Sequence, residues 1–360
     1  MRLGRRALIF TPVATRGALD MTTQHGPTIA EQSKVLLPQI AGYVGHRVIA
    51  MGLRTNLVPT LAEMGPTTQG KLADRLDFDP LYVEVWCRAA FSAGVLQRAD
   101  DKYELAPHME TLLLDTASPA YVGGVFTLLE QPEIFTGMET RLATSERLWW
   151  DETSPDFISQ VSGTGRPFYT RLIPDGLSRI AGLTEALEDE AVIVDTACGA
   201  GHGVIALARA YPSCQVVGVD GDAHSIELAR ERVAAAELGD QVELVVATLE
   251  DLDMADRFTL VINNISMHEC RDIDTVAANF KRALKPGGWL AISDFPFPTD
   301  DDGLRSVPGR IMSGIQFFEA QIDDQLLPRS AYDDLLERHS FNDIDWFEIS
   351  PLHAVTHGRA

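Results

Sequence analysis

Apolar residues recur at helical spacing through the first third of the chain. Residues 33–53 and 56–64 carry them every three or four positions, which predicts two helices. From Thr68 the pattern predicts a short capped helix, a turn at residues 78–80 and a longer helix. The segment that follows, VLQRADDKYELA, has the alternation of a β-hairpin. Helix, turn, helix and hairpin in this order predict a winged-helix module.

The middle of the chain is rich in aromatic residues. Residues 117–190 show helical spacing with interruptions, which predicts several short helices. The aromatic residues in this part include Phe126, Phe135, Trp149, Trp150, Phe157, Phe168 and Tyr169. Core packing accounts for most of them. The others are candidates to line an apolar pocket, because binding sites often form where two domains meet.

Strand and helix patterns alternate from Ala191 to the end of the chain. Five apolar runs predict parallel strands: AVIVDTA, QVVGVD, VELVVAT, FTLVINN and WLAISDF, the last preceded by a turn at KPGG. A helix, SAYDDLLERHSF, and two further strands, IDWFEI and HAVTH, complete the pattern. We therefore predict an α/β fold with a Rossmann-like sheet of seven strands. Such sheets bind ligands at the carboxyl ends of their strands.

These patterns divide the chain into four parts. We predict a winged-helix domain at residues 25–116, a helical connector at 117–190 and the α/β domain at 191–360. The arginine-rich start, residues 1–24, has an apolar stretch too short for a secretory signal peptide, so we expect a disordered extension there. Met21 is an alternative first residue of the native protein.

Composition and charge narrow the classes of function. The chain has 360 residues, 45% of them hydrophobic, and a formal net charge of -22. Such acidity disfavours nucleic acid and anionic membranes as partners, and the apolar runs are too short to span a membrane. Between Thr55 and Asp115 ten acidic residues outnumber five basic ones, which disfavours DNA binding by the winged helix itself. The four scattered cysteines lack metal-ligand spacing and suit reduced thiols in a cytoplasmic protein.

The stretch DTACGAGHG, residues 195–203, carries the strongest functional signal. An acidic residue ends a strand and three glycines follow, so backbone can approach a ligand closely and the next helix offers free N–H groups. The glycine spacing, Gly199-x-Gly201-x-Gly203, differs from the G-x-G-x-x-G of nicotinamide and flavin sites. Asp220 then ends the second strand, LED follows the third, INN ends the fourth, and LKPGGWLAISD leads into the fifth.

This ordered series, over about residues 190–358, resembles the class I S-adenosylmethionine-dependent methyltransferases. The resemblance implies S-adenosyl-L-methionine as cofactor and S-adenosyl-L-homocysteine as product. The positions that it implies for cofactor binding are Asp195, Ala197, Gly199, Gly201, Asp220, Gly221, Leu249, Glu250 and Asn263. Ala197 departs from the family, which usually has glycine there, and we expect its methyl group to shift the loop slightly without abolishing binding.

The resemblance also implies what these side chains do. Asp195 helps to order the glycine-rich loop and meets the cationic amino group of the cofactor. Asp220 accepts hydrogen bonds from both ribose hydroxyls, which suits its two oxygens. Leu249 and Glu250 cover the adenine and meet its exocyclic amine, and Asn263 lies beside the sulfonium.

The layout of the whole chain resembles small-molecule methyltransferases whose winged-helix module serves dimerisation and closes the acceptor pocket. The resemblance implies a homodimer and a small-molecule acceptor. In related O-methyltransferases a histidine after the fourth strand is the general base, and ISMHEC puts His268 at that position with Glu269 beside it. A purely structural His268 is the alternative that stays open. We predict no metal site, because Asp294 lacks the acidic and amide partners of a magnesium catechol site.

Two functions of different classes follow from these features. The first is an S-adenosylmethionine-dependent methyltransferase that acts on a small apolar or aromatic acceptor, at oxygen in preference to nitrogen or carbon. The alternative is a regulator without catalytic activity, which senses S-adenosylmethionine and binds DNA through the winged helix. The acidic charge argues against the regulator. The identity of the acceptor leaves no signal in the sequence.

Overall fold

The computed structural model describes residues 26–148, 150–188 and 190–360. The extension predicted at residues 1–24 lies outside these ranges, as does Trp149. Among the described residues, no helix combines the length and the apolar character that a membrane crossing needs.

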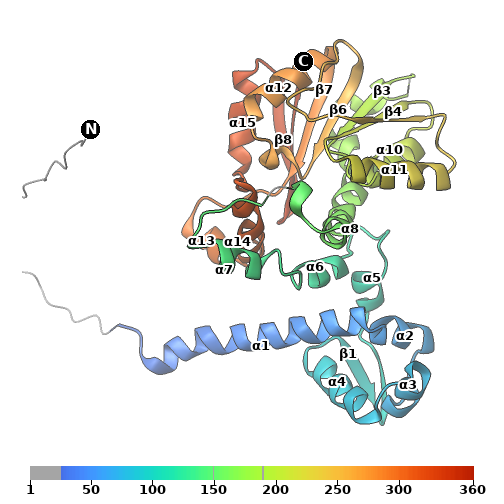
Figure 1. Cartoon of the computed structure of the whole chain (residues 1–360), viewed down its shortest axis with the longest axis vertical. Helices are drawn as coiled ribbons and strands as arrows, with labels where there is room; N and C mark the ends of the chain where they lie inside the picture. Colours follow the sequence, from blue (N-terminus) through green and yellow to red (C-terminus); the bar gives the residue numbers. More distant parts are fainter. Residues whose placement is uncertain (1–25, 149, 189) are drawn as a thin grey trace, which may run out of the picture. The chain divides into compact units, whose positions relative to one another are not determined.

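The N-terminal part follows the predicted order of helix, turn, helix and hairpin. Its elements are α1 (Ile29–Arg54), α2 (Leu57–Met64), α3 (Gln69–Leu76), α4 (Pro80–Ser92), β1 (Leu96–Ala99) and β2 (Lys102–Leu105) (Figure 1). Thr68 caps α3 by accepting a hydrogen bond from the backbone N–H of Lys71, and Asp79 caps α4 by accepting one from that of Leu81. β1 and β2 pair antiparallel. The capping side chains thus mark the starts of α3 and α4, and the hairpin follows α4 as the sequence indicated.

Apolar side chains of this part are distributed unequally. Helices α2 to α4 and the hairpin bury a core that includes Leu57, Val58, Leu61, Leu72, Val83, Trp86, Cys87 and Tyr103. The first part of α1, residues 29–44, exposes Val35, Leu36, Leu37, Ile40 and Tyr43. Contiguous exposed apolar side chains of this kind are typical of interaction surfaces.

Short helices connect this part to the sheet. They are α5 (Met109–Leu113), α6 (Gly123–Leu128), α7 (Phe135–Arg141), α8 (Pro155–Arg171) and α9 (Leu183–Ala186). Phe157 is fully buried, with its ring centroid 4.7 Å from that of Phe318, and the ring of Phe168 packs against Phe295 at 5.0 Å. These two aromatic residues therefore serve packing.

The C-terminal part is built on a sheet of seven strands. They are β3 (Val192–Thr196), β4 (Gln215–Asp220), β5 (Val242–Val246), β6 (Phe258–Asn264), β7 (Leu284–Asp294), β8 (Asn342–Ser350) and β9 (His353–Arg359). The strand order is β5-β4-β3-β6-β7-β9-β8, with the first five parallel and β9 antiparallel to both of its neighbours. The predicted fold class, an α/β protein with a Rossmann-like seven-stranded sheet, is confirmed.

Alternating side chains of the strands bury two separate cores. Ile193 of β3 packs on the face that α10 (His202–Ala210) and α11 (Ala223–Ala235) cover. Val194, the next residue, packs on the opposite face with α12 (Ile273–Ala283) and α15 (Arg329–Arg338). Figure 1 shows α10 and α11 apart from α12 and α15, with the strands between them. Both faces are covered, which explains why the central strands β3 and β6 are mostly apolar, whereas the edge strand β5 is less buried.

The turn predicted at KPGG is instead an irregular part of β7. Leu284 pairs with Phe258 and Trp289 pairs with Leu260, so the register between β7 and β6 shifts across these residues. Gly287 has a φ of 77°, a conformation that glycine adopts without steric cost. The segment therefore bulges within the strand and does not end it.

Candidate active site

The predicted cofactor positions converge at the carboxyl ends of β3, β4, β5 and β6. In the register of the sheet Asp195 lies opposite Gly218 of β4, and Thr196 lies opposite Asn263 of β6. Asp220 ends β4, and Glu250 follows β5. Side chains that are far apart in the sequence thus meet at one edge of the sheet, as expected for parallel strands.

The glycine-rich turn brings its backbone close to neighbouring elements. Gly201 has a φ of 84°, and a Cβ atom on it would lie 2.9 Å from the Cβ of Ala229 on α11. A Cβ on Gly203 would collide with the Asp195 carboxylate and the Tyr169 ring. Only glycine fits these two positions, and α10 begins directly after Gly201 with its N–H groups at the turn.

Ala197 carries backbone strain in this turn. Its φ is 58°, in the left-handed region where a Cβ atom is disfavoured. The family position that Ala197 occupies usually holds glycine, and the conformation accounts for that preference. The methyl group of Ala197 therefore costs conformational energy in this turn.

Ala197→Gly should therefore stabilise the protein. Removing the left-handed alanine conformation contributes about 1–2 kcal/mol, and the greater conformational freedom of glycine in the unfolded chain offsets about half of this. We expect the free energy of unfolding to rise by about 0.5–1 kcal/mol in a denaturant titration. Ala200→Gly, at the buried neighbour without positive φ, should be destabilising. If Ala197→Gly lowers the free energy of unfolding, the backbone of Ala197 is not strained.

Asp195 is a buried acid with one unpartnered oxygen. Its Oδ1 accepts a hydrogen bond of 3.0 Å from the hydroxyl of Tyr169 on α8, whereas its Oδ2 has no hydrogen-bond partner among the described residues. Burial raises the pKa of this carboxyl to about 8, opposed by the Tyr169 hydrogen bond and assisted by the charge of Asp220. The carboxyl thus needs a positively charged partner to be stable in its ionised form.

Asp195→Asn should stabilise the ligand-free protein increasingly as the pH rises from about 5 to about 8. Because the pKa of Asp195 is higher in the folded than in the unfolded chain, the contribution of this carboxyl to folding stability is most favourable below about pH 4 and falls until pH reaches about 8. Asparagine keeps an acceptor for Tyr169 and does not titrate. Relative to wild type, the variant should gain about 1–4 kcal/mol of unfolding free energy between pH 5 and pH 8. Urea titrations of both proteins at about pH 5 and about pH 8 test this. If the difference in unfolding free energy between variant and wild type is the same at both pH values, the prediction is wrong.

Asp220 already accepts two backbone hydrogen bonds. The N–H of Gly199 donates to its Oδ2 and the N–H of Asp222 donates to its Oδ1, both at 2.8 Å. Burial raises the pKa of this carboxyl, and the two N–H donors oppose the shift. Each oxygen keeps a second lone pair, so the carboxylate can accept two further hydrogen bonds side by side. A Cβ atom on Gly221, the next residue, would lie 3.7 Å from the nearest atoms of Thr248, which is an ordinary contact distance.

The loop after β5 is held by α12. Asn279 donates hydrogen bonds to the carbonyl oxygens of Leu249 and Glu250, at 3.0 and 2.7 Å. Leu249 is buried, and the Glu250 carboxylate accepts a long hydrogen bond of 3.4 Å from the N–H of Asp272. The backbone at the two predicted adenine-binding positions is therefore fixed by a residue about thirty positions further along the chain.

Asn263 is fully buried at the end of β6. Its Nδ2 donates to the hydroxyl of Thr196 at 3.1 Å, and that hydroxyl donates to the carbonyl of Ile262 at 2.8 Å. The Oδ1 of Asn263 has no partner within the described part of the chain. A buried unpaired acceptor is costly, so this atom is available to a ligand or to water.

His268 belongs to a second cluster of polar side chains. It lies in a short helix after β6, Met267–Glu269, and its side chain is only 1% exposed. Nδ1 is hydrogen-bonded to Asp294 Oδ2 at 2.8 Å. Asp294 also accepts from the hydroxyl of Tyr332 at 2.6 Å and from the N–H of Phe295 at 2.7 Å. Asp294 thus fixes the orientation of the imidazole ring and leaves Nε2 free.

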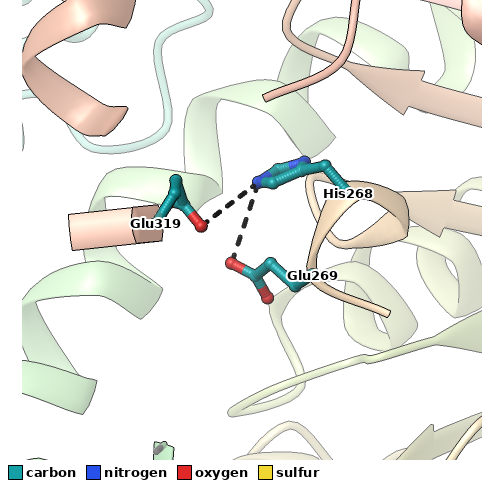
Figure 2. A group of neighbouring side chains, drawn as sticks. All are labelled: His268, Glu269 and Glu319. Atoms are coloured by element: carbon teal, nitrogen blue, oxygen red, sulfur yellow. Dashed lines mark ion pairs between the residues drawn. The ribbon is translucent and has the colours of Figure 1, made fainter. Parts of the chain in front are cut away.

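Two further carboxylates lie near the free nitrogen of His268. Nε2 is 3.8 Å from Glu319 Oε2, at the end of α14 (Val307–Glu319), and 3.9 Å from Glu269 Oε1 (Figure 2). Neither Nε2 nor Glu319 Oε2 has a hydrogen-bond partner among the described residues. Burial disfavours the charged imidazole, but Asp294 and the two glutamates outweigh it and raise the pKa of His268 to about 10. Burial also raises the pKa of Glu319 to about 7, with His268 opposing the shift.

A family model links the first cluster to known proteins. The model described as "Methyltransferase domain" matches residues 193–288, which hold the glycine-rich turn, Asp220, Asn263 and His268. Residues 193–288 form a methyltransferase domain. The resemblance to class I S-adenosylmethionine-dependent methyltransferases, inferred from the order of motifs, is thereby confirmed for this domain.

Curated relatives share part of their length with the chain. A trans-aconitate 2-methyltransferase from Azoarcus sp. (strain BH72) is 33% identical over 143 residues, which are 39% of this chain and 52% of that protein. The chain thus matches about half the length of this relative.

Solved structures match the chain in fold over nearly its whole length. A mitomycin 7-O-methyltransferase is 18% identical with a TM-score of 0.69, and the match covers 92% of this chain and 98% of that one. An O-methyltransferase family protein from Burkholderia thailandensis is 16% identical with a TM-score of 0.66, over 91% and 97%. At these identities the likeness shows the fold, including a helical region before the methyltransferase domain.

The residues of the methyltransferase domain fit S-adenosylmethionine. Asp195 Oδ2 is a buried, unpartnered oxygen that suits the cationic amino group, and Asn263 Oδ1 is a second unpartnered acceptor. Gly201 and Gly203 let the turn pack closely on Ala229 and on Asp195 with Tyr169, and the N–H groups at the start of α10 lie at this turn. The Asp220 carboxylate has the two oxygens that a pair of ribose hydroxyls needs.

Several residues of the two clusters had no signal in the sequence. Tyr169 holds Asp195, Asn279 holds the loop after β5, and Glu319 and Tyr332 complete the surroundings of His268 and Asp294. In the sequence, Tyr169 is one of many aromatic residues in the middle of the chain. The others lie on helices whose spacing predicts burial and gives no indication of the partner.

Proposed function

We propose that the chain is an S-adenosylmethionine-dependent methyltransferase that methylates a small apolar or aromatic acceptor at oxygen. The observation that carries the proposal is the buried His268, whose Nε2 lacks a partner and lies 3.8 Å from an equally unpartnered carboxylate oxygen. Two such atoms suit a hydroxyl group, which can accept a hydrogen bond from one and donate to the other. The names of the solved neighbours, which are O-methyltransferases, support the same acceptor atom.

The cofactor is held by the residues of the first cluster. Asp195, with Ala197, Gly199 and Gly201 around it, binds the methionine end, and Asp220 with Gly221 binds the ribose. Leu249 and Glu250 cover the adenine, and Asn263 lies at the sulfonium. When bound, S-adenosylmethionine supplies the electrophilic methyl group.

The protein's own contribution is to orient the acceptor and to take its proton. His268 is the catalytic residue: its raised pKa keeps Nε2 protonated, so Nε2 can donate a hydrogen bond to the acceptor oxygen, and Glu319 Oε2 faces the same hydroxyl. The hydroxyl passes its proton to the Glu319 carboxylate as the methyl group moves, and the His268 imidazolium stabilises the negative oxygen. Asp294 and Tyr332 keep the ring in place. Burial of the cluster excludes water from the reacting oxygen.

We further propose a cytoplasmic homodimer whose interface includes residues 33–115. The exposed apolar side chains of α1 support an interface, and all four cysteines are free thiols, which suits a reducing compartment. Light scattering at micromolar concentration should give twice the mass of one chain. The regulator that binds DNA is disfavoured by the net charge of -22.

A screen for transfer tests the enzymatic proposal against the regulator. The protein is incubated with S-adenosylmethionine labelled in the methyl group and with a panel of phenols, catechols and hydroxylated heterocycles, and products are analysed by mass spectrometry. A labelled methyl ether is the expected result. Labelled products confined to nitrogen or carbon would overturn the choice of acceptor atom. Salt-dependent binding of random duplex DNA without any transfer would favour the regulator.

A further inference from the structure

Three side chains converge on one point at the proposed acceptor site. His268 and Glu269 come from the same short helix, and Glu319 comes from the end of α14 (Figure 2). One ligand atom from each, His268 Nε2, a Glu269 oxygen and a Glu319 oxygen, lie within 4.8 Å of one another. His268 and Glu319 are 5% and 4% exposed. Their facing atoms have no hydrogen-bond partner in the described chain.

We propose that His268, Glu269 and Glu319 form a binding site for one divalent transition-metal ion, Zn²⁺ in the first place. Three donor atoms aimed at a common point, two of them buried and unpartnered, are what an ion requires and what a packed core avoids. The site was not predicted from the sequence, because Glu319 is 50 residues away from the His268-Glu269 pair.

The distances between the donor atoms suit a transition-metal ion after a small contraction. Zn²⁺ forms bonds of about 2.0–2.2 Å to nitrogen and carboxylate oxygen, so tetrahedral ligands lie roughly 3.3–3.6 Å apart. The observed separations from His268 Nε2 are 3.8 Å to Glu319 and 3.9 Å to Glu269. Glutamate side chains can close this difference by rotation. The imidazole disfavours Mg²⁺ and Ca²⁺, which take oxygen ligands.

The surroundings of His268 resemble those of a metal-bound histidine. Its other nitrogen is hydrogen-bonded to Asp294, which is itself held by Tyr332. A carboxylate on the second nitrogen fixes the ring and makes the first nitrogen a better ligand. The Glu269 side chain is 22% exposed, so the point of convergence has a route to solvent.

Charge also favours a cation at this point. The negative charges of Asp294, Glu319 and Glu269 raise the pKa of His268. Those of Asp294 and Asp324 raise the pKa values of Glu269 and Glu319, so several acidic groups lie close together here. The cations near them are His268 itself and Arg271, which acts on Asp324. A divalent ion among these acids offsets the cost of burying several carboxylates close together.

Occupation by an ion has one consequence that rests on the proposed function. His268 Nε2 cannot bind Zn²⁺ and hold a proton toward the acceptor oxygen at the same time. An ion at this site therefore inhibits methyl transfer, and it leaves the residues of the cofactor site untouched. Binding itself does not depend on the proposed function, so the two claims fail separately.

Metal binding to the whole protein tests the site without any substrate. The protein is freed of metal by chelation, dialysed against ZnCl₂ and assayed by mass spectrometry, and Co²⁺ absorption reports the coordination. We expect about one ion per chain and visible Co²⁺ bands that Zn²⁺ abolishes. Glu319→Gln should weaken binding at least about tenfold, and His268→Ala should remove the bands. Glu337→Gln, at an exposed position of α15, is the control and should bind as wild type does.

Two results would overturn the site. One is the absence of bound Zn²⁺ in wild type, and the other is binding that Glu319→Gln and His268→Ala leave unchanged, which would assign the ion to other ligands. Circular dichroism and binding of S-adenosylhomocysteine show whether each variant is folded. If Zn²⁺ binds as expected but does not inhibit transfer, the metal site stands and the role of His268 at the acceptor oxygen is wrong.

Discussion

His268→Ala should lower the turnover of a phenolic acceptor by about 10²- to 10⁴-fold, the usual worth of positioned proton transfer. The affinity for S-adenosylhomocysteine should stay nearly unchanged, because the ring of His268 contacts Asp294 and faces Glu319, and none of these is among the proposed cofactor residues. The loss should appear equally in kcat and in kcat/KM if the interaction is made only in the transition state. Steady-state kinetics of wild type and His268→Ala with several acceptors measure both kcat and kcat/KM.

A series of acceptors separates proton removal from positioning. A phenol that is already ionised at the pH of the assay needs no base, so the deficit of His268→Ala should shrink as the pKa of the acceptor falls. His339→Ala, which removes a surface histidine paired with Asp274, is the matched control and should retain activity. A deficit that is the same for every acceptor, or a simultaneous loss of cofactor affinity, would make His268 a structural residue.

Asp220→Ala should weaken the binding of S-adenosylhomocysteine about 100-fold or more. The substitution removes two charge-assisted hydrogen bonds to the ribose, each worth about 1.5–3 kcal/mol. It also releases the N–H groups of Gly199 and Asp222, which the carboxylate holds in the ligand-free protein. The glycine-rich turn therefore becomes less ordered, which adds to the loss. Calorimetric titration with S-adenosylhomocysteine measures the affinity.

Conservative and distant variants make the Asp220 result specific. Asp220→Asn keeps one acceptor oxygen and should lie between wild type and Asp220→Ala. Asp253→Asn, whose side chain is fully exposed, removes the same charge elsewhere and should bind as wild type does. Equal affinities for all four proteins would show that the ribose is bound by other residues.

The strands and helices of the sheet domain could be predicted because the patterns that specify each element lie within the element itself. Each strand is a short apolar run with a turn after it, and each helix has its own spacing and cap, so neighbours in the chain suffice. The KPGG segment is the exception, since Gly287 permits a bulge as well as a turn and only pairing with β6 decides between them. The pairing of β7 with β6 determines the bulge, and the local sequence does not specify that pairing.

The two clusters differ in how far sequence could indicate them. Asp195, Gly201 and Asp220 end strands or form turns, and their spacing follows the order of the strands. Glu319 and Tyr332 come from helices 51 and 64 residues after His268, and any acid or tyrosine on those helices would look the same in sequence. Their role depends on how α14 and α15 pack around His268 and Asp294. The structure was needed to see that His268 is surrounded by acids.

The binding of S-adenosylhomocysteine to the wild-type protein tests the central claim most directly. In a calorimetric titration at neutral pH, we expect one molecule per chain with a dissociation constant in the micromolar range and weaker or absent binding of NAD. The same protein with Asp220→Ala should give little heat. No binding of S-adenosylhomocysteine to wild type, or tighter binding of NAD, would contradict the assignment of the glycine-rich turn and of Asp220 to this cofactor.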